Sequence, residues 1–126
     1  FNRGQRENAF GHRVRVLTGD RNEFDVFERR FAGERFDAVI DMICFSPQQA
    51  ISAVRAFRGR CEQFIFCSTV CVYGGDIPPG VVVDESFARN PVSDYGRNKK
   101  TCEDAFLDAH ARGDFAATVI RPSHTY

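Results

Sequence analysis

The chain is predicted to fold as an α/β domain, a doubly wound parallel sheet with helices on both faces. Strand-like and helix-like segments alternate along its 126 residues. The strand-like segments are short, nearly continuous apolar runs, which is typical of strands buried on both faces. Polar residues follow these runs, and ligands of such sheets bind beyond the carboxyl ends of the strands. The sequence therefore predicts both the architecture and the edge that carries the function.

Each element has a local signal. Apolar runs predict strands at 13–17, 37–44, 63–67 and 115–120, and helical patterns cover 23–31, 47–57 and about 91–111. The first helix carries phenylalanines at i, i+3 and i+7, which form one apolar stripe. Ser46 and Pro47 have the pattern of an N-cap followed by proline at the first helical position, and Gly113 suits the position just after the last helix. Glycines and prolines between 74 and 90 predict an irregular surface loop.

Composition excludes several classes of protein. The formal net charge is zero, with no basic block, so the sequence lacks the electrostatic signature of a nucleic-acid-binding protein. No apolar run approaches the ~18 residues that a membrane span needs. The five cysteines form an odd set without a CxxC motif or paired histidines at metal-binding spacing. We therefore expect no metal, reduced thiols and a cytoplasmic protein.

The most informative feature is the spacing of Tyr95 and Lys99. Residues four apart lie on one helix face, about 5–6 Å apart at Cβ, so both side chains can meet one bound molecule. A neighbouring positive charge favours the phenolate form, which suits an acid or base that transfers a proton. Of 17 Lys and Arg residues only two are lysines, at 99 and 100. The alternative is a solvated lysine one turn after a half-buried tyrosine.

The ordered set of motifs resembles an extended short-chain dehydrogenase/reductase of the NAD-dependent epimerase/dehydratase family. The resemblance is carried by Phe1-Asn2-Arg3-Gly4, Gly19-Asp20, the run 66–74, Tyr95-Gly96-Arg97-Asn98-Lys99 with Cys102-Glu103, and the run 120–126. Each motif alone is loose, but together they span the chain in the family's order. The resemblance implies a Rossmann-type fold and a nicotinamide cofactor.

The resemblance also implies catalytic roles. Tyr95 would pass a proton to or from a substrate hydroxyl or carbonyl while hydride moves to or from the nicotinamide. Lys99 would hold the ribose hydroxyls and favour the tyrosinate. Thr69 would hydrogen-bond the reacting oxygen, the alternative being a hydroxyl that only caps the end of a strand.

Further residues are implied in cofactor binding. These are Asn2, Arg3, Asp20, Ser68, Pro122 and Ser123, together with Tyr95 and Lys99. Asp20 matches an acidic residue near the adenine, although a turn aspartate is an alternative. Arg3 stands where an acid would bind the ribose of NAD, and an arginine there can take a 2′-phosphate. The cofactor is expected to be NADP or NAD, with NADP favoured.

Two parts of the family pattern are absent from the sequence. The glycine-rich turn that would cradle the pyrophosphate belongs to a first strand–helix unit, and a smaller C-terminal domain would select the substrate. We therefore interpret residues 1–126 as a partial NAD(P)-binding Rossmann domain. Without a central strand the sheet would keep unpaired edges, so we expect the isolated chain to be marginally stable and to bind cofactor poorly.

The resemblance implies epimerisation or reduction of a small molecule, with a sugar nucleotide as the expected substrate. Related dehydratases carry an Asp-Glu pair after the active-site threonine, whereas Val70 and Cys71 follow here, which disfavours dehydration. The expected partners are the substrate and a second copy in a homodimer, with no membrane and no nucleic acid. The alternative from another class is a non-catalytic nucleotide- or RNA-binding protein on the same fold.

Overall fold

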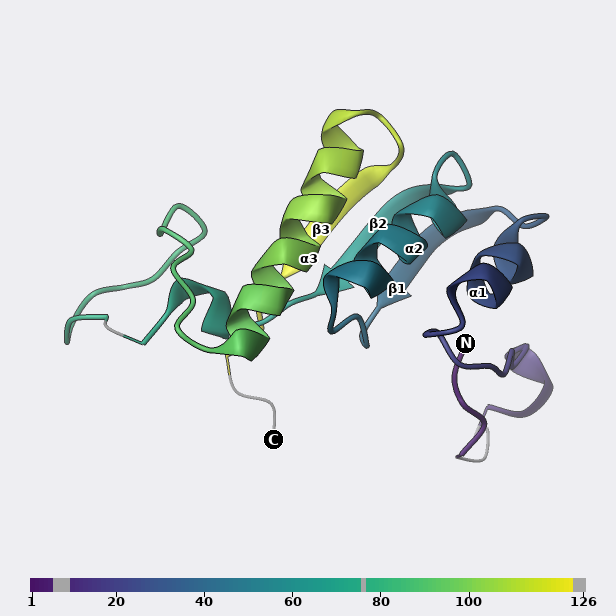
Figure 1. Cartoon of the computed structure of the whole chain (residues 1–126), viewed down its shortest axis with the longest axis horizontal. Helices are drawn as coiled ribbons and strands as arrows, with labels where there is room; N and C mark the ends of the chain where they lie inside the picture. Colours follow the sequence, from purple (N-terminus) through teal and green to yellow (C-terminus); the bar gives the residue numbers. More distant parts are fainter. Residues whose placement is uncertain (6–9, 76, 124–126) are drawn as a thin grey trace.

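The computed structural model describes residues 1–5, 10–75 and 77–123. The elements alternate as expected of an α/β fold (Figure 1). In chain order they are η1 (Gly11–Arg13), α1 (Phe24–Phe31), β1 (Phe36–Asp41), α2 (Pro47–Phe57), β2 (Cys61–Cys67), η2 (Val70–Tyr73), α3 (Asp94–Ala111) and β3 (Ala116–Ile120). No helix in these ranges is both long and apolar enough to cross a membrane.

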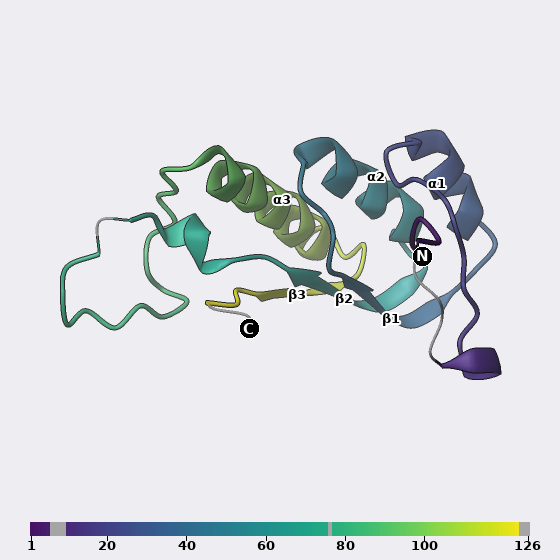
Figure 2. The same ribbon diagram turned by 90° about the horizontal axis from the view of Figure 1, so that it is seen from below.

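The three strands form a parallel sheet in the order β1-β2-β3. Parallel neighbours need crossover connections, which are right-handed in nearly all proteins. Because the strand order advances in one direction, successive right-handed crossovers place their helices on the same side of the sheet. Figure 2 shows α1, α2 and α3 over one face. The parallel α/β class is confirmed.

The second face of the sheet differs from the expectation of helices on both faces. Over the described residues no helix covers it, and Ile40 and Ile120 are 63% and 49% exposed there. The physical reason is the strand order: helices reach the other face only when the order reverses beyond β1. The apolar composition of the strands predicts burial on both faces of the sheet, but the three helices cover the strand side chains on one face.

The expected strand at 13–17 does not form. Val14 and Val16 are exposed, and among the residues that the structure describes the strand pairing at this segment is an isolated parallel bridge between Asn2 and Thr18. A groove of about 420 Å³ separates this bridge from the edge of β1, with a lining that is mostly apolar. A strand is held extended by a ladder of hydrogen bonds to a neighbouring strand, and over the described residues that ladder is limited here to the bridge at Thr18.

The core lies between the sheet and the three helices and is built largely from phenylalanine. Phe64 of β2 stacks on Phe106 of α3, with ring centroids 4.6 Å apart, and on Phe115 at 5.0 Å. Phe27 and Phe31 of α1 pack edge-to-face, so the apolar stripe predicted for this helix is confirmed. This packing fixes α3 against the strands and so positions the residues that α3 carries.

Candidate active site

Lys99 of α3 reaches the carboxyl ends of two strands. Its side chain is 1% exposed, and its ammonium donates hydrogen bonds to the carbonyl oxygens of Cys44, at 3.0 Å, and Cys67. The ring of Phe66 lies 4.3 Å from Nζ. Burial lowers the pKa of Lys99, and nearby cysteines and Asp41 offset this only in part. Lys99 is therefore not a solvated lysine, and two of its three donors are engaged.

Tyr95 lies in the first turn of α3, which Ser93 caps by accepting a hydrogen bond from the Gly96 amide at 3.1 Å. This turn is pressed against η2, since a Cβ on Gly96 would stand 2.5 Å from the carbonyl oxygen of Cys71. The Tyr95 side chain is 44% exposed. Its hydroxyl has no hydrogen-bond partner within the described ranges, so it is accessible to a ligand.

Thr69 follows β2 and is buried. Its hydroxyl oxygen accepts a hydrogen bond from the Cys71 amide at 3.2 Å and so caps η2. Capping uses the oxygen as an acceptor and leaves the hydroxyl hydrogen free to donate. The Thr69 hydroxyl therefore caps η2, and this role is compatible with donation of a hydrogen bond to a reacting oxygen.

The ends of β2 and β3 bring another pair of predicted segments together. The Ser68 amide donates to Ile120 O at 2.7 Å, and the Val70 amide donates to Pro122 O at 3.1 Å. Ser68, Thr69 and Pro122 therefore lie side by side. Ser123 lines a cavity of about 590 Å³ with residues of η2 and of the 77–85 loop. The last three residues of the 120–126 motif lie outside the described residues.

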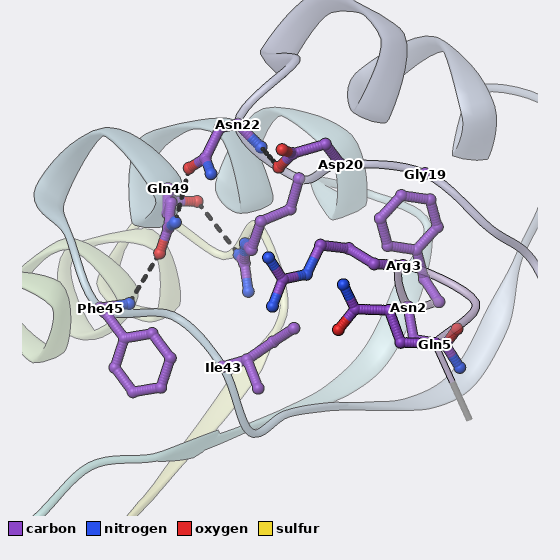
Figure 3. Close-up of a pocket in the computed structure, with 11 residues that line it drawn as sticks. Asn2, Arg3, Gln5, Gly19, Asp20, Asn22, Ile43, Phe45 and Gln49 are labelled. Carbon is purple, nitrogen blue, oxygen red and sulfur yellow. Dashed lines mark hydrogen bonds between the residues drawn. The ribbon is translucent and has the colours of Figure 1, made fainter.

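The remaining predicted residues meet elsewhere along the same edge. Asn2, Arg3 and Asp20 line an open cavity of about 580 Å³, and Arg3 extends across it (Figure 3). One Asp20 oxygen accepts from the Asn22 amide at 2.8 Å, as a turn aspartate does. Asn2, Arg3 and Asp20 therefore form one group, and Ser68, Thr69 and Pro122 form a second group beside the Lys99 ammonium at the end of β2.

Phe45 connects the two groups and was not predicted. It lines the cavity that holds Arg3, and its ring lies 5.2 Å from the Nζ atom of Lys99. Gln49 helps to fix this residue, because its side-chain oxygen accepts a hydrogen bond from the Phe45 amide at 2.7 Å. The sequence offers no signal for Phe45 beyond its place just after a strand.

Two buried ion pairs also escaped sequence reasoning. Arg21 pairs with Asp41 through two hydrogen bonds of 2.6 and 2.9 Å. The sequence signal for this pair was Asp41 itself, a carboxylate within a mostly apolar strand. Glu103 accepts from Arg121 through both oxygens, at 3.0 and 2.9 Å, and from Arg89 at 2.9 Å. Although burial opposes ionisation, the hydrogen bonds from Arg121 and Arg89 lower the pKa of Glu103.

Glu103 and its partners Arg121 and Arg89 connect α3 to neighbouring parts of the structure. Arg121 also donates to the Tyr73 hydroxyl at 2.6 Å, so its guanidinium, just after β3, links Glu103 of α3 to Tyr73 of η2. The signal in the sequence was spacing: Glu103 stands four residues after Lys99 and so on the same helix face. Its partners, however, come from distant segments.

Comparison with known proteins places this geometry in a family. The model of the NAD dependent epimerase/dehydratase family matches residues 1–126. A 2'-dehydrokanamycin reductase of Streptomyces kanamyceticus is 31% identical over 90% of the chain, and a UDP-glucose 4-epimerase of Rhizobium leguminosarum bv. trifolii is 28% identical over 95%. A Burkholderia cenocepacia J2315 protein thought to be an epimerase superposes with a TM-score of 0.78 at 20% identity, covering 98% of the chain and 44% of that structure.

The two curated relatives are considerably longer than this chain. The chain spans 31% of the reductase and 44% of the epimerase. The family match, by contrast, extends over every residue of the sequence, and the solved relative shares its fold. The chain belongs to the NAD dependent epimerase/dehydratase family.

Proposed function

We propose that this chain binds the cofactor in an NAD(P)-dependent epimerase or reductase of the short-chain dehydrogenase type. The substrate would present a hydroxyl or carbonyl on a sugar nucleotide or a similar small molecule. Support comes from the family and from relatives named as a reductase and as a UDP-glucose epimerase. The observation that carries the proposal is the buried Lys99 ammonium at the ends of β1 and β2, beside the segment of Thr69.

The residues present fit a nicotinamide dinucleotide. The cavity of about 580 Å³ offers an amide, a guanidinium and a carboxylate from Asn2, Arg3 and Asp20, which suit the ribose, phosphate and base of an adenosine. Phe45 leads from this cavity to Lys99. Ser68, Pro122 and Ser123 would border the other end. The bound cofactor would supply or accept hydride.

The chain's own residues would then position the substrate and move its proton. Tyr95 would exchange a proton with the reacting oxygen through its exposed hydroxyl, and Thr69 would donate a hydrogen bond to the same atom. Lys99 would stabilise the tyrosinate by its charge and hold ribose hydroxyls with the donor that the two carbonyls leave free. Val70 and Cys71 offer no carboxylic acid after Thr69, so dehydration is not part of the proposal.

The two lysines allow a matched test of this function. Lys99→Met keeps the length of the side chain but removes the charge, and we expect turnover to fall roughly 100-fold and nicotinamide binding to weaken. Lys100→Met removes a partly exposed lysine that pairs with Asp104 at 3.1 Å, and it should leave turnover within about twofold of wild type. Steady-state kinetics and cofactor titration measure both. Equal behaviour of the two variants would contradict the assignment.

The preference for NADP depends on Arg3. A guanidinium that binds a 2′-phosphate contributes a charged hydrogen bond worth about 1.5–3 kcal/mol, so Arg3→Asp should weaken NADP binding by roughly 10–100-fold. NAD lacks that phosphate, and its affinity should stay the same or improve. Arg13→Asp provides the control, because this arginine is also exposed and lies outside the cavity lining. Fluorescence titrations with both cofactors decide the matter, and parallel losses for NADP and NAD would refute the preference.

A further inference from the structure

Two cysteines that the proposed chemistry does not use lie in contact within the core. Cys44 stands in the segment between β1 and α2, and Cys102 lies on α3. Both are fully buried, and their Sγ atoms are 3.8 Å apart, with the Cys44 thiol donating to the Cys102 sulfur. A disulfide needs an S–S distance of about 2.05 Å. The two Sγ atoms therefore need to come about 1.8 Å closer to form the bond.

The surroundings favour one thiolate in this pair. The hydrogen bond from Cys44 and the positive charges of Lys99 and Arg21 lower the pKa of Cys102, against the effects of burial and of Asp41. The same hydrogen bond, together with burial, raises the pKa of Cys44. The pair thus has the two partners that disulfide formation requires, a sulfur with thiolate character and a thiol in contact with it.

We propose that Cys44 and Cys102 form a reversible intrachain disulfide when the protein meets a peroxide. The Cys102 thiolate attacks one peroxide oxygen and breaks the O–O bond, which gives a sulfenic acid and, after protonation, water. The Cys44 sulfur then attacks the Cys102 sulfur, loses its proton and expels a second water. Overall, two thiols and one hydrogen peroxide give one disulfide and two waters. A dithiol reductant restores both thiols by thiol–disulfide exchange and is itself oxidised to a disulfide.

The local structure gives a small oxidant a route to the pair. Cys44 is flanked by Ile43 and Phe45, which are 46% and 49% exposed, in a segment that is neither helix nor strand. Such a segment can open locally without unfolding the sheet. The other three cysteines, Cys61, Cys67 and Cys71, make no thiol–thiol contact within the described part of the chain.

The disulfide would act on the site through Lys99. The carbonyl oxygen of Cys44 accepts a hydrogen bond from Lys99, and Cys102 lies one helical turn after it. Closing the S–S bond shifts this carbonyl relative to α3 and removes the thiolate charge near the ammonium. This consequence rests on the proposed function: if Lys99 serves catalysis, turnover should fall several-fold on oxidation and return after reduction.

Peptide mapping of the intact protein tests the modification itself. After treatment with hydrogen peroxide, free thiols are alkylated and the protein is digested without reduction. We expect a peptide pair joined through residues 44 and 102, which dithiothreitol separates. The crosslink closes a long loop and so limits the unfolded chain, and the oxidised protein should therefore melt several degrees above the reduced one. Neither measurement needs cofactor or activity, so both stand even if the proposed function fails.

Matched variants make the outcome decisive. Cys44→Ala and Cys102→Ala should each abolish the crosslinked peptide and the rise in melting temperature. In Cys44→Ala the sulfenic acid on Cys102 has no resolving thiol, and dimedone should label it. Cys61→Ala, at another buried cysteine, and Cys71→Ala, at an exposed one, should keep the crosslink. Oxidation of Cys71 without any 44–102 peptide, or a crosslink formed only in denaturant, would overturn the proposal.

Discussion

Replacing Tyr95 by phenylalanine is expected to lower turnover by roughly 10²–10⁴-fold, the range that a positioned general acid or base contributes. Only the hydroxyl is removed, and the aromatic ring remains. That hydroxyl has no hydrogen-bond partner in the described parts of the chain, and the side chain is 44% exposed. Stability and nicotinamide affinity should therefore change little. Kinetics, cofactor titration and thermal melting of one protein preparation measure the three quantities.

Tyr73→Phe is the matched control, since it removes the same atom from a tyrosine with a structural role. The Tyr73 hydroxyl accepts a hydrogen bond from Arg121 at 2.6 Å, and the residue is buried. Its loss should cost about 1–3 kcal/mol of stability because a charged donor loses its partner. The two variants should thus have opposite profiles, one losing turnover and the other stability. Unchanged turnover in Tyr95→Phe would refute the catalytic assignment.

Elements with strong local signals were predicted well from the sequence. The second predicted helix has the observed bounds, Pro47–Phe57, because the Ser46 hydroxyl accepts from the Gln49 amide and proline fits the first turn. The third begins at Asp94 rather than near 91, because Ser93 provides the cap. In each case short-range hydrogen bonds set the boundary, and the residues that make them are neighbours in sequence.

Features that need a distant partner were not predictable in the same way. The 13–17 run has strand-like composition, but a strand forms only where another strand pairs with it, and the sequence does not show whether one is there. The Lys99 spacing pointed to a site, yet its two carbonyl acceptors are 55 and 32 residues away. The thiol pair joins residues 58 apart. Such contacts depend on which strand ends meet in space.

The second large effect is expected for Glu103→Gln, which should lower the free energy of unfolding by about 3 kcal/mol. Glu103 is fully buried and neutralises Arg121 and Arg89, whose side chains are 15% and 24% exposed. Glutamine keeps the shape but removes the charge, and breaking a buried ion pair by changing one partner costs about 3–5 kcal/mol. The amide can still accept some of these hydrogen bonds, which places the expected cost at the lower end. Urea unfolding at neutral pH measures it.

In the wild-type protein, acidification should lower the free energy of unfolding as the Glu103 carboxylate becomes protonated. The pKa of Glu103 is lowered in the folded state, so the unfolded chain binds its proton at a higher pH than the folded one. The stabilisation is therefore complete above the unfolded value of about 4.3 and is lost as pH falls through the folded value. Glu103→Gln should lack this loss, whereas Asp104→Asn, at a neighbouring carboxylate that is 40% exposed, should cost less than about 1 kcal/mol at neutral pH. If Glu103→Gln unfolds at the wild-type urea concentration, the carboxylate does not hold α3, η2 and β3 together, and the geometry of the site must be maintained by the phenylalanine core alone.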